Sequence, residues 1–202
     1  MKLKPFLIGF FLSSLTHLCQ SQSLSRANFK ISDKKTSIVS VELLINNIIF
    51  EIDENGNILS FNYLPGGTFE WSNSSVNAGK LRSIGNINID YWSPTSVNGN
   101  KLKSIGKINI DYWPPTSIDG NKLKSIGDIS IDYWPPTSVY GNKLRSIANI
   151  IIDYWSNTSD NRGRVKSIGN ISMDYWSSSS VNSGKFKSIE GNSQDIYATM
   201  QE

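Results

Sequence analysis

The chain has 202 residues, with 20 Lys and Arg against 17 Asp and Glu, and it contains one histidine and one cysteine. The balance of charge is close to even, so it gives no reason to expect a nucleic-acid partner. A single histidine and a single cysteine are too few for a disulfide framework or for the usual zinc sites.

The N-terminal segment has a basic start and then an apolar run. Lys2 and Lys4 precede the mostly apolar stretch 6–18, and Cys19 and Ser21 place small residues at the two positions that a signal peptidase reads. This order is typical of a secretory signal peptide over residues 1–21, and the apolar run is too short to cross a bilayer. We therefore expect a secreted, periplasmic or cell-surface protein, with an N-terminal membrane anchor as the alternative.

Cleavage of that segment would remove the rarest residue types. His17 and Cys19 both lie inside it, and the loss of Lys2 and Lys4 would leave 18 basic residues against 17 acidic ones. We therefore expect no enzymatic activity, no cofactor, no metal and no nucleic-acid partner. No later stretch is long and apolar enough for a transmembrane helix.

Residues 22–76 precede the regular part of the chain. The stretch "LLINNIIFEID" places Asn46-Asn47 between two apolar strands, and "IDENGNILSFNY" is a second hairpin that turns at Asn55-Gly56. We expect the segment 38–71 to belong to the same sheet as the residues that follow. Residues 22–76 would then be N-terminal β-hairpins that cap the array.

A 21-residue unit repeats over residues 77–189. Ser-Ile recurs six times between Ser83 and Ile189, and Asp-Tyr-Trp recurs five times between Asp90 and Trp176. A weaker copy, "FEW", lies in register at 69–71. Fixed self-similarity at this period indicates a repeat architecture, in which each unit buries its apolar face against its neighbours. The pattern breaks down after Ile189, and we expect residues 190–202 to form a loose tail.

Each unit is predicted to form one β-hairpin. In the first full unit, apolar and polar residues alternate from Ile87 to Trp92, and Leu81–Ile84 is a second, shorter strand. Gly85-Asn86 between them has the composition of a type II′ turn, whose first residue needs a positive φ. Ala148 replaces the glycine in one unit, so we expect strain or a different turn there.

The hairpin register predicts which side chains share a face. Ile84 lies opposite Ile87 and Ser83 opposite Asn88, so the isoleucines and the tyrosine of a unit share one face, with the Arg82 stem beside them. The leucine, serine, aspartate and tryptophan fall on the other face. We expect the isoleucine face to form the core.

Links such as "PPTSIDGN" return the chain to the next hairpin, because proline ends a strand and Asp-Gly favours a turn. The expected fold is therefore all-β: an antiparallel meander of tandem β-hairpin repeats, with about fourteen strands, forming a curled or elongated sheet. A β-solenoid with one coil per unit is the alternative.

The repeated aromatic residues form the candidate site. They could stack on a ligand such as a sugar ring or a choline-like cation, or they could clasp neighbouring hairpins, and we favour packing. Each unit has one reliable carboxylate, too few for calcium or for paired-carboxylate catalysis. The ladder consists of Trp71, Tyr91, Trp92, Tyr112, Trp113, Tyr133, Trp134, Tyr154, Trp155, Tyr175 and Trp176.

Two functions follow from this pattern. The first is a secreted, non-enzymatic β-repeat protein that acts as a structural or interaction surface. The alternative is a carbohydrate- or cell-envelope-binding module that uses the Tyr/Trp ladder. The residues leave the partner open between an envelope glycan and another protein.

The run "GKLRSIGNINIDYW" resembles tandem repeats of uncharacterised secreted bacterial proteins, whose copies also contain Gly-Lys-Leu/Ile, Ile-Gly-Asn and an alternating strand ending in Tyr. The resemblance covers residues 77–189 and implies no activity. The period and aromatic content are also loosely similar to choline-binding and MORN-type hairpin repeats. This chain lacks the Gly-Trp start of the former and the Tyr-x-Gly-x-Trp pattern of the latter, so no functional residue is carried over.

Overall fold

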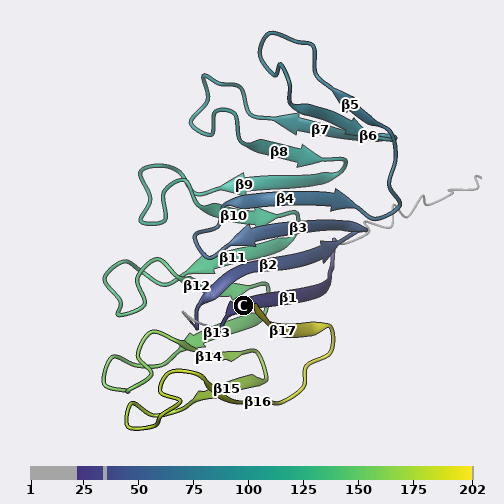
Figure 1. The fold of residues 1–202 in the computed structure, drawn as a ribbon. Coiled ribbons are helices and arrows are strands. Elements are labelled where there is room, and N and C mark those ends of the chain that lie inside the picture. Colours follow the sequence, from purple (N-terminus) through teal and green to yellow (C-terminus); the bar gives the residue numbers. More distant parts are fainter. Residues whose placement is uncertain (1–21, 34–35, 202) are drawn as a thin grey trace, which may run out of the picture.

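The computed structural model describes residues 22–33 and 36–201 and contains 17 β-strands in two sheets (Figure 1). The expected signal peptide, with His17 and Cys19, lies outside the described residues. A five-stranded sheet runs in the order β17-β1-β2-β3-β4. Its strands are β1 (Leu24–Ser32), β2 (Ile38–Ile45), β3 (Ile48–Asp53), β4 (Ile58–Tyr63) and β17 (Ile196–Gln201). No helix among the described residues is long and apolar enough to cross a membrane.

The repeats form a twelve-stranded sheet in which strands follow one another in chain order from β5 to β16. The predicted antiparallel meander of hairpins is therefore confirmed, and the solenoid alternative is wrong. The strands are β5 (Phe69–Trp71), β6 (Leu81–Ile84), β7 (Ile87–Tyr91), β8 (Leu102–Ile105), β9 (Ile108–Tyr112), β10 (Leu123–Ile126), β11 (Ile129–Tyr133), β12 (Leu144–Ile147), β13 (Ile150–Tyr154), β14 (Val165–Ile168), β15 (Ile171–Tyr175) and β16 (Phe186–Glu190).

The turn inside each hairpin has the predicted geometry. Ser83 pairs with Asn88 and Ile84 with Ile87, and Gly85 has φ +58°. Ala148 holds the same position with φ +51°, so this unit keeps the turn and places a Cβ in the left-handed region, where it is strained. The Asn46-Asn47 turn differs, because both residues have positive φ, as a type I′ turn requires.

A β-bulge between neighbouring hairpins corrects the predicted faces. Tyr91 pairs with Leu102 and Asp90 with Ser104, which leaves Lys103 as the extra residue. The bulge turns Leu102 onto the core face, where it is buried, and turns Lys103 outward. The assignment of the leucine to the tryptophan face, and of the Arg82-type stem to the isoleucine face, was therefore wrong.

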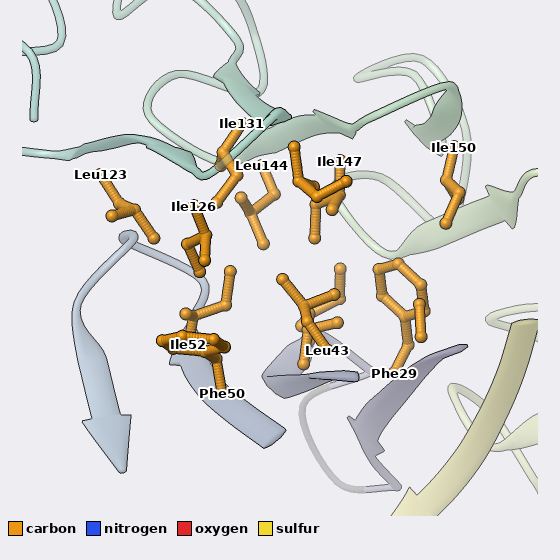
Figure 2. Packing of buried hydrophobic residues seen from close by; sticks show 14 of the residues in the cluster. Phe29, Leu43, Phe50, Ile52, Leu123, Ile126, Ile131, Leu144, Ile147 and Ile150 are labelled. Carbon is orange, nitrogen blue, oxygen red and sulfur yellow. The ribbon is translucent and has the colours of Figure 1, made fainter. Parts of the chain in front are cut away.

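The core lies between the two sheets. Phe29, Leu43 and Phe50 of the five-stranded sheet face Leu123 and Ile147 of the repeat sheet (Figure 2). The prediction that the segment 38–71 joins the repeat sheet is wrong for β2, β3 and β4 and right for β5. Gly66 and Gly67, with φ +72° and +154°, lie in the link where the chain passes from one sheet to the other. The N-terminal strands thus cover the isoleucine face, where they bury apolar area of both sheets.

The C-terminal segment is also more ordered than predicted. β17 pairs in parallel with β1, with Ala27 opposite Ile196 and Ile31 opposite Met200, so the prediction of a loose tail is wrong. This pairing completes the five-stranded sheet with residues that lie at the opposite end of the chain.

Candidate functional site

The tyrosine and the tryptophan of each unit point to opposite faces of the repeat sheet, because they are adjacent in the sequence. Tyrosines face the five-stranded sheet and tryptophans lie on the outer face, just past the strand end. The tyrosine row consists of Tyr91, Tyr112, Tyr133, Tyr154 and Tyr175. The tryptophan row consists of Trp92, Trp113, Trp134, Trp155 and Trp176. Trp71 is the last residue of β5 and pairs with Leu81 as Tyr91 pairs with Leu102, so it occupies a tyrosine position, and the predicted register of "FEW" with Asp-Tyr-Trp is wrong by one residue.

Most of the tyrosine row belongs to the core. Tyr133, Tyr154 and Tyr175 are 2%, 4% and 2% exposed. Their hydroxyls donate to backbone carbonyls ten residues earlier, at Leu123, Leu144 and Val165, over 3.0, 3.1 and 2.8 Å. Burial raises the pKa of all three far above the ordinary value, so they stay neutral and cannot act as bases at physiological pH. These tyrosines hold hairpins in register.

A row of lysines connects each repeat to the next. Lys101 Nζ lies 4.5 Å from the centroid of the Tyr112 ring and donates to the carbonyl of Asn121 over 2.6 Å. Lys122 makes the equivalent contacts, 4.3 Å from the Tyr133 centroid and 2.9 Å from the carbonyl of Asn142. Burial lowers the pKa of both lysines. The lysine row consists of Lys80, Lys101, Lys122 and Lys143.

The residue type of each acceptor follows from its backbone conformation. Asn100, Asn121 and Asn142 have φ between +67° and +69°, and Gly163 has φ +74°. Asparagine and glycine are the residues that tolerate this region best. Each of these residues also directly precedes the next basic residue, so one short motif supplies both the acceptor for the previous repeat and the donor for the following one.

The tryptophan row is also used between repeats. Lys103, the bulge residue, places its Nζ 5.2 Å from the centroid of the Trp92 ring, and Lys124 lies at the same distance over Trp113. The indole of Trp134 donates to the carbonyl of Ile152 in the following repeat over 3.4 Å. The internal tryptophans are half-buried, while Trp176 at the end of the row is 40% exposed. This geometry is what hairpin clasping requires.

The aspartates do not form a catalytic or metal-binding arrangement. One aspartate occurs every second strand, so neighbours are roughly 9–10 Å apart, given a strand spacing of about 4.8 Å. Asp132 pairs with Arg145 at 3.6 Å and Asp174 with Lys187 at 3.0 Å. The hydrogen bond from Lys187 lowers the pKa of Asp174. Within 22–33 and 36–201 there is no group of three His, Cys, Asp or Glu side chains able to hold a metal ion.

The loops that join the hairpins carry a feature that the sequence analysis missed. They project from one edge of the repeat sheet (Figure 1) and present one aliphatic side chain per repeat, 53% to 100% exposed. Asp160 interrupts the series in one loop. The signal was the fixed position of Val or Ile three residues before the Asn or Gly of each Asn-Lys or Gly-Lys pair. We name these residues the loop row: Val76, Val97, Ile118, Val139 and Val181.

The five loops after β7, β9, β11, β13 and β15 share one hydrogen-bonded conformation, whereas the loop after β5, which carries Val76, is one residue shorter and lacks it. In the loop after β9, Ser117 donates to the carbonyl of Pro114 over 2.9 Å, and Gly120 donates to that of Ser117 over 3.0 Å. A Cβ on Gly120 would lie 2.6 Å from the carbonyl oxygen of Pro115, so glycine is required there. The same contacts recur in neighbouring loops, and the loop row from Val97 onward is therefore held at a fixed spacing.

Two clefts border the N-terminal end of the repeat sheet. One, of about 350 Å³, is lined by Trp71, Asn73, Arg82, Asp90 and Tyr91, with neighbouring residues. The other, of about 480 Å³, lies between the residues of β4 and Tyr91, Leu102 and Tyr112 of the repeat sheet. At this end of the sheet the aromatic side chains Trp71, Tyr91 and Tyr112 are more exposed than the tyrosines further along the array, and both clefts open beside them.

Comparison with known proteins identifies no relative. No family model, curated protein or solved structure matches this chain.

Proposed function

We propose that this chain is a secreted, non-enzymatic β-repeat protein that acts as an interaction surface, and that the loop row is its contact face. The supporting observation is that the loop row is exposed and rigidly held, whereas the internal aromatic residues are used in contacts between hairpins. Aliphatic side chains repeated roughly every 9–10 Å suit a partner that is itself repetitive, because several weak contacts then add up.

The absence of reactive groups supports the non-enzymatic part of the proposal. Residues 22–202 contain no His and no Cys, and the aspartates of the Asp-Tyr-Trp triplets occupy the same position in each repeat. A single catalytic centre needs groups whose environments differ, so that one acts as acid and another as base.

Export can be tested by N-terminal sequencing of the secreted protein. The sequence should begin between Gln20 and Arg26, because the basic, apolar and small-residue order ends there. Recovery of Met1 in the exported fraction would contradict the secretory assignment.

The contact face can be tested by retention of the purified chain on washed cell envelopes. The triple change Val97→Asp, Ile118→Asp and Val139→Asp should lower retention by about tenfold or more without changing the melting temperature. Val39→Asp with Ile151→Asp is the control, since both residues are exposed on strands. Equal retention of the loop variant and the parent chain would refute the proposed face.

One observation favours a second candidate, carbohydrate binding at the end of the array. The cleft at Trp71 combines an open indole ring with Asn73, Arg82 and Asp90, the residue types that stack on and hydrogen-bond to sugars. Under this alternative Trp71→Ala would abolish retention on envelope glycan and leave the fold intact. Trp113→Ala would instead destabilise the fold.

A further inference from the structure

β4 is an unprotected edge strand. Among the described residues it pairs only with β3, and its sequence, ILSFNY, contains neither proline nor a charged residue. The two edge strands of the repeat sheet, in contrast to β4, carry charged residues. β5 has only three residues and contains Glu70, and β16 contains Lys187 and Glu190. Natural sheets normally protect their edges with charge, proline or short length. The opposite edge strand of the five-stranded sheet, β17 (IYATMQ), also lacks proline and charge. What distinguishes β4 is the cleft that lies between it and the repeat sheet, and the two features together suggest that this edge receives another strand.

The register shows which backbone groups are free. The two-residue turn at Asn46-Asn47 makes Ile45 and Ile48 a hydrogen-bonded pair, so alternate residues of β3 point to β2 and to β4. Phe61 lies opposite Phe50, which points to β2. The N–H and C=O of Phe61 therefore point away from β3, toward the open side of the sheet.

A cleft lies on that open side. Its volume is about 480 Å³, with Leu59 and Phe61 on one wall and Tyr91, Leu102 and Tyr112 on the other. One repeat further into the array, Gly56 of the β3–β4 turn packs against the Tyr133 hydroxyl, and Tyr133 is fully covered. The cleft therefore lies where the packing between the five-stranded sheet and the repeat sheet ends, at β4.

The tyrosines of the cleft lack the contacts of the other members of their row. Tyr91 and Tyr112 are half-buried, and within the described part of the chain their hydroxyls have no hydrogen-bond partner. Polar atoms and apolar rings thus line the same cleft, as is usual in sites that bind an extended peptide.

A second copy of the chain fits this edge poorly. The repeat sheet extends past β4, with β5, β6 and β7 lying beyond it (Figure 1). If two copies paired β4 to β4 about an axis perpendicular to the sheet, both overhanging repeat sheets would occupy the same space. An occupant of one strand, which brings no second sheet on that side, avoids this clash.

The charges near the cleft indicate the direction and chemistry of the occupant. Asn57, just before β4, lines the cleft together with Lys101, so β4 begins at the loop edge. A strand antiparallel to β4 would end there, near Lys80 and Lys101, which lie over the Tyr91 and Tyr112 rings. Neither lysine has a carboxylate partner among the described residues. An acidic group at the end of the added strand would complement them.

We propose that β4 and its cleft bind an extended segment of a partner protein as an added antiparallel strand, with alternating apolar residues and an acidic group or C-terminal carboxylate beside Lys80 and Lys101. This site is separate from the loop row and does not depend on the function proposed for it. Backbone hydrogen bonds to Phe61 would provide affinity, together with the N–H of Tyr63, whose carbonyl already accepts from Gly66 N–H, and the cleft would select the side chains.

The test uses a displayed library of random peptides of about eight residues with free C-termini, panned against the full chain. That length matches β4 with one residue to spare at each end. Enriched sequences should alternate apolar residues, lack central proline and end in an acidic group. Leu59→Lys should weaken their binding by about tenfold or more, because an edge lysine opposes strand addition. Val39→Lys is the matched control, since Val39 is similarly exposed but lies on the interior strand β2.

Several outcomes would overturn the proposal. They are the absence of enriched peptides, and binding that Leu59→Lys leaves unchanged. A dimer of the chain alone that Leu59→Lys abolishes would assign the edge to a second copy. Equal affinity for peptides with a free and an amidated C-terminus, in sequences without other acidic residues, would remove the role of Lys80 and Lys101. The loop-row variant should bind these peptides normally, so a failure here is distinct from a failure of the proposed function.

Discussion

Replacing Lys122 by methionine tests whether the lysine row holds consecutive repeats together. The change removes a charged hydrogen bond of 2.9 Å to the carbonyl of Asn142, which contributes about 1.5–3 kcal/mol, and the contact with the Tyr133 ring, which contributes about 1 kcal/mol. The same change breaks the 3.7 Å ion pair between Lys122 and the buried Asp119. It also removes the cost of keeping an ammonium group half-buried, which offsets part of that loss. We expect a net destabilisation of about 2 kcal/mol, or roughly 4–8 °C in melting temperature for a chain of this size.

The control is Lys124→Met, two residues away. Lys124 is exposed and lies 5.2 Å from the centroid of the Trp113 ring, and no hydrogen bond joins it to the next repeat in the described structure. This substitution should cost less than about 1 kcal/mol. Urea denaturation followed by circular dichroism would give both free energies of unfolding. If the two variants are equally stable, the contact with Asn142 does not join the repeats and the packing interpretation fails at this point.

Three further predictions concern the turns and the tyrosine row. Ala148→Gly should stabilise the chain by about 0.5–1 kcal/mol in the same denaturation assay, because it relieves a Cβ at φ +51°, and a loss of stability would contradict this. Gly127→Val should cost about 1 kcal/mol more than Gly106→Val, because both residues have φ near +58° but only a side chain at 127 would displace the Gln22 amide, which donates to the carbonyl of Lys107; equal midpoints would exclude the Gln22 contact. Stability should fall above about pH 10, since the raised pKa of buried Tyr133, Tyr154 and Tyr175 keeps them protonated in the folded state while the unfolded state loses protons. The slope should approach about 4 kcal/mol per pH unit, and a flat profile from pH 10 to pH 11 in thermal melts would contradict the burial of these rings.

Local features of the hairpin could be read from a single repeat. The turn at Gly85-Asn86, the pairing of Ile84 with Ile87 and the alternation along Ile87–Tyr91 all involve neighbours within a few residues. Each is dictated by steric limits on φ and by the two-residue period of a strand, which are properties of the local sequence.

The bulge and the lysine row could not be predicted from a single repeat. Whether Lys103 interrupts the pairing of β7 with β8 depends on how two hairpins, separated by a loop of ten residues, pack against each other. Its effect is large, because a shift of one residue exchanges the two faces and moves Leu102 into the core. The carbonyl that accepts from Lys101 is 20 residues away in the chain.

The candidate site also combines features that the sequence predicted with features that it did not. The sequence predicted the aromatic ladder and favoured a packing role, and the contacts of Trp134 and Tyr133 are of that kind. The exposure of Val97 and Ile118 was not predicted, because their fixed spacing marks a repeated position but does not say whether the side chain points outward. The cleft beside β4 could not be predicted from the sequence, because it exists only where two sheets of unequal width overlap.

The sequence by itself determined the repeating hairpin, its register, its turns and the all-β class, because these depend on interactions within about 21 residues of chain. Only the tertiary structure decided that β1 to β4 form a second sheet, that β17 joins it, and that the two sheets enclose one core. The physical reason is that apolar burial is non-directional: an alternating strand shows that it has an apolar face, but not which surface will cover it.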